Sequence, residues 1–184
     1  MSEQLWWYVA RSGGIVALAL ATLSVVWGLA LSTKITDGKP RPAWLLDLHR
    51  MLGGASVAFT AIHVAALMLD SYVSFGLTDV LVPFASNWSP GAVAWGIVAM
   101  YLLLAVQASS LMIKRLPKKL WRAIHMTSFG VFIAGTVHGL QAGTDAGHPI
   151  YVGGTVASIV AVAFLTAYRV LGPRRGSRRP ALAA

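Results

Sequence analysis

The sequence predicts an all-α, polytopic transmembrane helical bundle with five clear spans. Apolar residues make up 57% of the 184 residues and charged residues only 11%, whereas soluble domains are roughly 45–50% apolar and about 25% charged. The charges fall in short clusters. Between the clusters lie uncharged stretches of about 18 residues or more, which is the pattern of helices that cross a bilayer.

The first predicted span covers about residues 9–31. At roughly 1.5 Å per residue it is long enough to cross a hydrocarbon core of about 30 Å. Three aromatic residues at 6–8 precede it as an interfacial belt. A cleaved signal peptide is the competing interpretation, but Glu3 and Arg11 do not provide the cationic segment that a signal peptide needs. We therefore expect an uncleaved span.

A polar linker at 33–42 reverses the chain, and the second span covers about residues 45–69, closed by Asp70. Residues 71–89 are only moderately apolar and contain helix-breaking residues such as Pro83. We expect them to form an interfacial, re-entrant or short sixth segment rather than a full span.

Ser89 followed by Pro90 marks the start of a third span that ends near residue 113, because proline is favoured in the first turn of a helix. A basic turn leads to a fourth span at about 120–140. A polar loop then leads to a fifth span at about 151–171.

The positive charges predict the orientation. Of the 15 Lys and Arg residues, only Arg11 lies on one side of the five spans, and the other 14 lie at linkers and ends on the opposite side. By the positive-inside rule, we expect a multi-pass plasma-membrane protein with its N-terminus outside and its C-terminus in the cytoplasm. The predicted parts are a transmembrane domain at 1–171 and a basic, disordered cytoplasmic tail at 172–184, for which anionic lipid is the default partner. The same asymmetry explains the net charge of +9 without nucleic acid.

Four of the five histidines lie in two of the predicted spans. His49 and His63 are fourteen residues apart on the second span, and His125 and His138 are thirteen apart on the fourth. Because both spans run from the cytoplasm to the outside, we expect His49 level with His125, and His63 level with His138. Ionisable groups inside a span are costly and usually mark function.

Two imidazole pairs predict two haem groups. There are no cysteines, which excludes iron–sulfur clusters and covalent haem attachment. A pair of imidazoles from two helices, with no carboxylate near, suits an iron porphyrin held on both axial faces. Because both axial positions are then filled, electron transfer across the bilayer is the favoured role, and metal ligation is assigned to all four histidines.

Helical geometry makes one of these spacings awkward. At about 100° per residue, a step of fourteen residues rotates the side-chain direction to within about 40° of four whole turns, so His49 and His63 share a helix face. A step of thirteen residues instead leaves His125 and His138 about 140° apart around the helix axis. The fourth span therefore needs a kink or a π-bulge between His125 and His138, for which Gly130 is one plausible place and Gly135 another.

Other functions remain open. The histidines could instead bond neighbouring helices in a haem-free structural or transport membrane protein. A transition-metal site would usually recruit carboxylates, but Asp47 is the only one within a span and lies at its cytoplasmic mouth. A proton relay fails for the same reason.

Three arginines are candidate cofactor-binding residues through the haem propionates. Arg11 lies near the outer end of the first span, where snorkelling to the headgroups is the alternative. Arg50 and Arg122 lie beside or one turn from His49 and His125, and positive-inside orientation also explains them.

The histidine spacing resembles that of a known family. The patterns H-x13-H from His49 to His63 and H-x12-H from His125 to His138 resemble the ferric-reductase-like transmembrane domain. This domain is shared by ferric reductases, NADPH oxidases and the haem-binding membrane subunit of methionine sulfoxide reductase. The resemblance covers about residues 6–171.

Two further points bear on the resemblance. Family members usually have six spans, and five are clear here. The cytochrome b of respiratory complexes is a rival, although its two histidine pairs usually have near-equal spacing. A weaker resemblance to actinobacterial members lies in the opening motif Trp7-Tyr8-x-Ala10-Arg11-x-x-Gly14.

The chain contains no G-x-G-x-x-G fingerprint, so no flavin or NAD(P)H domain is expected within it. We therefore expect an oxidoreductase subunit that acts as an electron-transfer component with two haem b groups. Its donor would be a separate flavoprotein or a quinol, and the outer acceptor is left unidentified.

Overall fold

The computed structural model describes residues 4–33, 43–71 and 73–172. Most of the first polar linker and nearly all of the basic tail predicted at 172–184 lie outside the described residues, so their predicted roles stay predictions. The described residues form helices, turns and loops and no strand. The helices, in chain order, are α1 (Leu5–Ser32), α2 (Ala43–Leu69), α3 (Leu77–Leu81), α4 (Pro90–Leu111), α5 (Lys118–Met126), α6 (Ser128–Ala142) and α7 (Pro149–Leu171).

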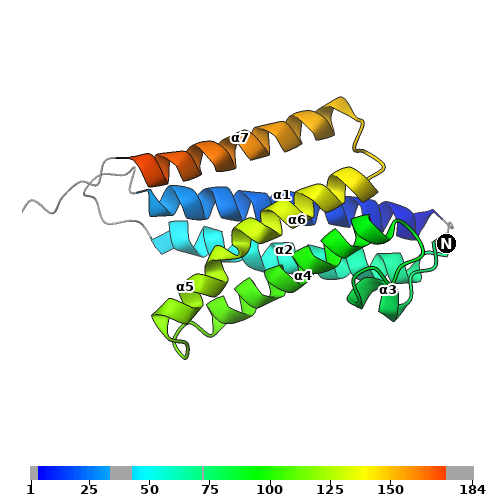
Figure 1. Ribbon diagram of the computed structural model, residues 1–184, viewed down its shortest axis with the longest axis horizontal. Helices are drawn as coiled ribbons and strands as arrows, with labels where there is room; N and C mark the ends of the chain where they lie inside the picture. The colour runs from blue at the N-terminus through cyan, green and yellow to red at the C-terminus, as the bar shows by residue number, and fades with distance from the viewer. Residues whose placement is uncertain (1–3, 34–42, 72, 173–184) are drawn as a thin grey trace, which may run out of the picture.

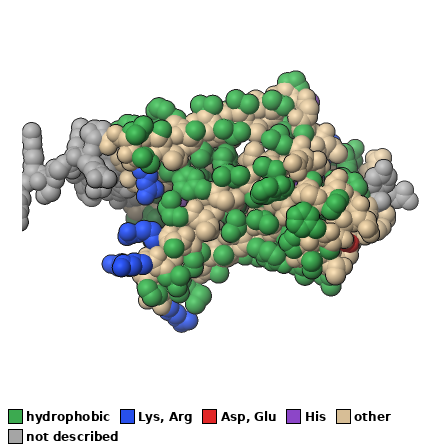
Figure 2. Space-filling view, viewed as in Figure 1, with side chains coloured by type: hydrophobic (Ala, Val, Ile, Leu, Met, Phe, Trp, Pro, Cys, Tyr) green, Lys and Arg blue, Asp and Glu red, His purple; other side chains and the backbone are tan. Residues whose placement is uncertain are grey.

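Five helical segments of the described chain are long and apolar enough to cross a membrane. They are α1, α2, α4, the consecutive pair α5 and α6, and α7. The five predicted spans are therefore confirmed, each within a few residues of its predicted bounds. Large apolar side chains remain exposed along the bundle, Phe164 of α7 among them, and Figure 2 shows such side chains over much of its surface. A lipid environment accounts for this exposure.

The bundle contains two closely packed helix pairs. Helix α1 lies along α2, and α4 lies along α6, while α1 also contacts α6 and α7 (Figure 1). Small buried residues on α1, spaced three or four apart, allow the close approach: Ala10, Gly13, Ala17 and Ala21. Each closely packed pair contains one histidine-bearing segment, and α4 also contacts α5.

The two ends of the bundle differ in charge. We call the end at which α1 ends, α2 begins, α4 gives way to α5 and α7 ends the basic end. Exposed Lys and Arg side chains gather there in Figure 2. The opposite end, called the N-terminal end, holds the start of α1, helix α3 and the connection between α6 and α7 (Figure 1).

The segment at 71–89 does not cross the bundle. It contains only the five-residue helix α3, and two of its apolar residues, Phe75 and Val80, pack against Val93 and Ile97 of α4. None of its described residues belongs to a helix long enough to span a membrane, which agrees with the expectation that the segment is not a full span. It covers one side of the N-terminal end.

Candidate cofactor site between two histidine pairs

The four intramembrane histidines face each other in two pairs. At the basic end, the ring of His49 on α2 lies 6.0 Å from the ring of His125 on α5, measured between ring centroids. Towards the N-terminal end, His63 on α2 lies 6.3 Å from His138 on α6. These are the two pairs expected from the depths of the residues in their spans.

The ring separations suit a metal held between two imidazoles. Two metal–imidazole bonds of about 2 Å, with about 1 Å more from each ligating nitrogen to its ring centre, put the centres about 6 Å apart. A direct hydrogen bond between two imidazoles would bring the rings closer, and neither pair forms one among the described hydrogen bonds. Each pair therefore leaves room for one atom between the rings.

Backbone carbonyls hold three of the four rings by the Nδ1 atom. His63 Nδ1 lies 2.6 Å from the carbonyl oxygen of Ala10, and His138 Nδ1 lies 2.7 Å from that of Ala92. His49 Nδ1 lies 3.1 Å from the carbonyl oxygen of Ser24. A carbonyl only accepts, so Nδ1 carries the hydrogen and Nε2 keeps its lone pair for a metal. This is the usual support for a metal-binding histidine.

A glycine lies one helical turn after each of these carbonyls. A Cβ on Gly14 would lie 2.9 Å from His63 Nδ1, and a Cβ on Gly96 would lie 2.8 Å from His138 Nδ1. On Gly28, a Cβ would lie 3.1 Å from His49 Cε1. The missing side chains therefore give the imidazoles room to reach the carbonyls.

The fourth histidine has a different support. The residue fourteen positions after Gly96 on α4 is Ser110, and its hydroxyl oxygen lies 3.4 Å from His125 Nδ1. A hydroxyl takes the place of the carbonyl at this site; it can donate as well as accept, and it accepts from Nδ1 when Nε2 is the metal ligand. His125 is consequently held less tightly through Nδ1 than the other three histidines.

Sequence reasoning did not assign these supporting glycines to the histidines. A usable signal was present, because Gly14 and Gly28 are fourteen residues apart on α1, the same spacing as His49 and His63 on α2. Two antiparallel helices in close contact bring equal spacings into register. The register itself, however, becomes known only from the packing of α1 against α2.

An apolar cavity adjoins the second histidine pair. Its volume is about 270 Å³, and both His63 and His138 line it. Mainly apolar side chains from α1, α2, α4 and α6 form its walls, and Phe75 and Trp88 from the 71–89 segment line it towards the N-terminal end. A mainly apolar cavity beside two carbonyl-bound imidazoles is what a flat, largely apolar macrocycle needs. The residues present fit a haem.

The break in the fourth span lies at Thr127. Helix α5 ends at Met126 and α6 begins at Ser128. The Thr127 hydroxyl donates to the Ile124 carbonyl at 2.7 Å, competing for an acceptor of the helical ladder. A kink between the two histidines was predicted, but its suggested positions at Gly130 and Gly135 were wrong, because both residues lie within α6.

Two of the three candidate arginines have carboxylate partners. Arg11 forms a two-point ion pair with Asp145 in the turn between α6 and α7. This pair lies at the edge of the cavity beside the outer histidines, and both residues line it. The hydrogen bond from Arg11 holds the pKa of Asp145 below its ordinary value, with partial burial opposing the shift.

The other two arginines lie at the basic end and are exposed. Arg50 pairs with Asp47 at 3.2 Å on the same helix turn, with both side chains about two-thirds exposed (67% and 65%). Arg122 is exposed on α5, one turn before His125.

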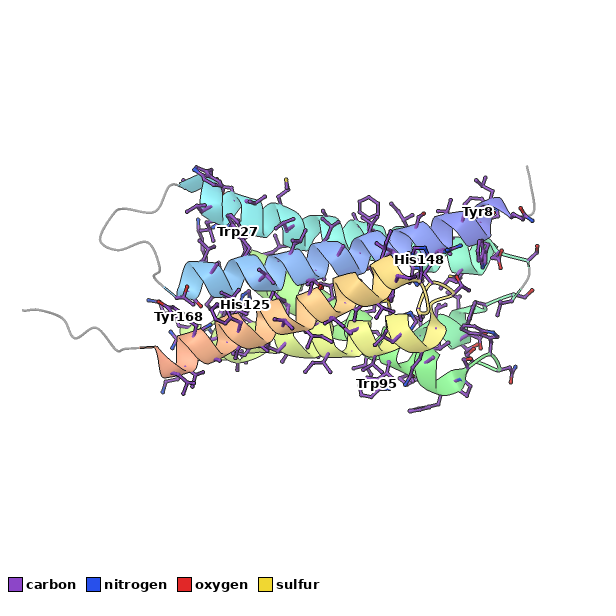
Figure 3. All side chains as sticks on the ribbon, turned by 90° about the horizontal axis from the view of Figure 1, so that it is seen from above. Tyr8, Trp27, Trp95, His125, His148 and Tyr168 are labelled. Carbon is purple, nitrogen blue, oxygen red and sulfur yellow. The ribbon has the colours of Figure 1, made fainter. Side chains whose placement is uncertain are left out.

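The histidine outside the pairs lies at the opposite end from His125, near Tyr8 (Figure 3). His148 caps α7 by accepting a hydrogen bond from the backbone N–H of Ile150. It also lines a groove of about 610 Å³ between α1 and α7. The groove reaches Arg11 and Asp145 but neither histidine pair.

Neither histidine pair belongs to a larger cluster of ligands. Among the residues that the structure describes, no three His, Asp or Glu side chains come together in a group that could hold a metal ion. Two imidazoles alone are a sparse site for a free ion. They are a full axial set for a cofactor that supplies its own equatorial ligands.

Comparisons with known proteins identify a family for the chain. The family described as "Ferric reductase like transmembrane component" matches residues 13–136. The chain is also 33% identical over 98 residues to the protein-methionine-sulfoxide reductase heme-binding subunit MsrQ of Azospira oryzae. That match covers 52% of this chain and 40% of the relative, so the chain spans less than half the length of the curated relative it matches. No solved structure matches the chain.

The family match covers more than half of the chain. It includes all of α2 and α4 and ends just before His138. This multi-pass membrane protein therefore belongs to the ferric reductase-like transmembrane component family.

Proposed function

We propose that this chain carries electrons across a membrane through two b-type haems, each held by two histidines. The inner haem lies between His49 and His125 at the basic end. The outer haem lies between His63 and His138. The basic end faces the cytoplasm, because Lys and Arg gather on the cytoplasmic side of membrane proteins.

One observation carries the proposal. Both ring pairs have the centroid separation of a bis-imidazole site, 6.0 Å and 6.3 Å, and the Nδ1 atoms of His49, His63 and His138 point to carbonyls. The second fact matters because a ring that donates from Nδ1 to a carbonyl keeps the lone pair of Nε2 for a metal. Histidines that only join helices would use Nε2 for a hydrogen bond as well.

The protein's own contribution is to fix the ligands and exclude water. A bound haem supplies an iron that accepts and releases one electron at a time, and two axial imidazoles leave no open position for oxygen chemistry. The carbonyls of Ala10, Ser24 and Ala92 set the basicity of the rings and hence the redox potentials. Mainly apolar walls around the outer pair limit the access of water. Along α2, the step of fourteen residues from one ligand to the other spans about 20 Å.

The reaction partners are separate proteins or membrane quinol. Electrons enter from a separate flavoprotein or from a quinol. The relative from Azospira oryzae is named as the heme-binding subunit of a protein-methionine-sulfoxide reductase. By this likeness, the outer acceptor is a catalytic subunit that reduces methionine sulfoxide.

Spectroscopy on the purified chain tests the proposal. Expression with ample haem should give reduced-minus-oxidised spectra of low-spin b-type haem, with two haems per chain in a haem assay. His49→Ala and His125→Ala should each remove the inner haem and leave the outer one. His63→Ala and His138→Ala should each remove the outer haem.

Two results would contradict it. A purified wild-type chain without haem would favour the haem-free structural or transport role. Loss of the same haem in His49→Ala and His138→Ala would show that the histidines pair differently. Haem reduction by quinol analogues without any flavoprotein would identify a quinol as the donor, as in a quinol-linked cytochrome b.

A further inference from the structure

An indole N–H near the inner histidine pair lacks a partner. The Nε1 atom of Trp121 is buried, and no described residue accepts a hydrogen bond from it. Buried polar groups are nearly always hydrogen-bonded, because an unpaired N–H has lost its bonds to water without replacement. Among the described residues, only one other buried side-chain atom lacks a hydrogen-bond partner, an oxygen of Asp70 towards the opposite end of the bundle. Trp121 therefore needs an acceptor from outside the described residues.

The indole ring lies directly beside an axial ligand. Trp121 precedes His125 by one turn of α5, and the two rings stack with centroids 5.0 Å apart and planes 27° apart. A side chain stacked on an axial imidazole lies at the rim of whatever that imidazole binds. The unpaired N–H is thus within the surroundings of the inner site, on the helix that Figure 3 shows at the end marked by His125.

The charges around Trp121 favour an anionic acceptor. On the same short helix, Lys118, Lys119 and Arg122 are all exposed. At this end the described chain supplies one carboxylate, Asp47, and Arg50 already pairs with it. An N–H donor on a helix that carries three exposed cations suits a carboxylate, which forms stronger hydrogen bonds than a neutral acceptor does.

We propose that Trp121 is a binding residue for the inner haem, with its indole N–H donating a hydrogen bond to a propionate carboxylate. This inference rests on the proposed function, since it requires a haem between His49 and His125. The sequence indicated only arginines as partners of the haem propionates, and Trp121 adds an uncharged donor to them. Stacking on His125 gives Trp121 a second contact that orients the axial ring.

The test distinguishes the contribution of the indole N–H from that of the aromatic ring. Trp121→Phe keeps an aromatic face and removes the donor, and the control is Trp95→Phe. Trp95 is 41% exposed on α4 and lies on the outside of the bundle in Figure 3. Both variants should keep two haems, which are assigned as inner and outer by comparison with His125→Ala and His138→Ala.

Two readouts should change only in Trp121→Phe. Loss of a hydrogen bond to a charged group should speed the transfer of the inner haem to apomyoglobin about tenfold. The redox component of the inner haem should move to lower potential, because the propionate charge, no longer shared with a donor, favours the oxidised iron. The outer component should stay unchanged, which a general loss of folding would not produce.

Each alternative outcome is distinct. If Trp121→Phe matches Trp95→Phe in both readouts while the wild type holds two haems, Trp121 does not bind the propionate, and the proposed function stands. If the wild type holds no haem, both proposals fall. If Trp121→Phe does not fold, Trp121→Gln, which has an N–H donor, should retain the inner haem better than Trp121→Leu. Equal retention in those two variants overturns the inference.

Discussion

The Nδ1 atom of His63 lies 2.6 Å from the carbonyl oxygen of Ala10, and the residue one turn later on α1 is Gly14. A Cβ at Gly14 would lie 2.9 Å from that same Nδ1 atom, closer than ordinary van der Waals contact. The hydrogen bond and the glycine therefore depend on each other. Helix α1, which carries none of the histidines, thus sets the position of two of them.

We expect Gly14→Ala to displace His63 and to weaken binding of the outer haem. Alanine favours a helix over glycine by about 1 kcal/mol, so any loss must come from the clash with the imidazole. Haem per chain should fall from about two towards about one, with the inner spectrum retained. A haem assay with reduced-minus-oxidised spectra measures this.

The control for that variant is Gly153→Ala on α7. A Cβ there meets no atom within 4 Å, so both haems should remain. Full haem content and an unchanged outer spectrum in Gly14→Ala would show that the imidazole does not need this glycine.

Ser110 should tune the inner haem. Its hydroxyl lies 3.4 Å from His125 Nδ1, and an acceptor at Nδ1 raises the basicity of the ligating nitrogen. Ser110→Ala should therefore raise the potential of the inner haem, because a less basic ligand stabilises the ferric state less. A spectroelectrochemical titration resolves the two components.

The matched control is the neighbouring serine. Ser109 is buried, and its hydroxyl donates to the Val106 carbonyl of its own helix at 3.0 Å. Ser109→Ala should leave both potentials unchanged. Equal shifts in the two variants would assign the effect to helix packing rather than to His125.

Sequence reasoning could predict the spans because their signal is local. An uninterrupted apolar stretch must be helical in a bilayer, where backbone groups have no water to bond. Helix α4 begins at Pro90, as the Ser89–Pro90 pair predicts, although Ser89 makes no side-chain cap and has a left-handed backbone with φ of 40°. The 71–89 segment could not be resolved in this way, because Phe75 and Val80 are ordered by contacts with α4.

The candidate site was predictable only in part. Histidine depth follows from position along a span, so the pairing of His49 with His125 could be derived. The partners of Nδ1 could not, because they depend on the register between α1 and α2 and between α4 and α6. The ion pair between Arg11 and Asp145 could not be predicted either, because the two residues are 134 residues apart in the chain and meet only through helix packing.

The ion pair between Arg11 and Asp145 should stabilise the bundle above acid pH. It ties the start of α1 to the turn between α6 and α7. The pKa of Asp145 is lowered below its ordinary value of 3.8 by the hydrogen bond from Arg11. The stabilisation is therefore full above 3.8 and is lost as pH falls through the lower folded pKa. Asp145→Asn should lower the melting temperature in detergent by a few degrees at neutral pH.

The difference in melting temperature between the wild type and Asp145→Asn should shrink as the pH falls, because the wild-type carboxyl then becomes protonated and loses its charge. The comparison variant is Asp47→Asn, which removes an exposed pair with Arg50 and should change the melting temperature little. A difference for Asp145→Asn that stays constant down to the acid limit would rule out the ion pair as its cause.

The hydroxyl of Thr127 should favour the helix break that brings His125 and His49 together. Thirteen residues of straight helix would leave His125 and His138 about 140° apart, and the break between α5 and α6 removes this mismatch. The hydroxyl of Thr127 holds the Ile124 carbonyl at 2.7 Å, which favours the break over a continued helix. Thr127→Val keeps the shape and removes the hydroxyl, so it should favour a straighter span and rotate His125 away from His49. A hydrogen bond of this kind contributes about 1 kcal/mol, so we expect partial loss of the inner haem with the outer haem intact.

The control for Thr127→Val is Thr166→Val on α7. Thr166 donates to the Val162 carbonyl at 2.7 Å within an unbroken helix, so removing its hydroxyl changes no helix direction. Spectra should show the wild-type amount of both haems in Thr166→Val and a deficit of the inner haem alone in Thr127→Val. Loss of the outer haem in Thr127→Val would mean that the break positions His138 instead, and that α5 finds its place against α4 without it.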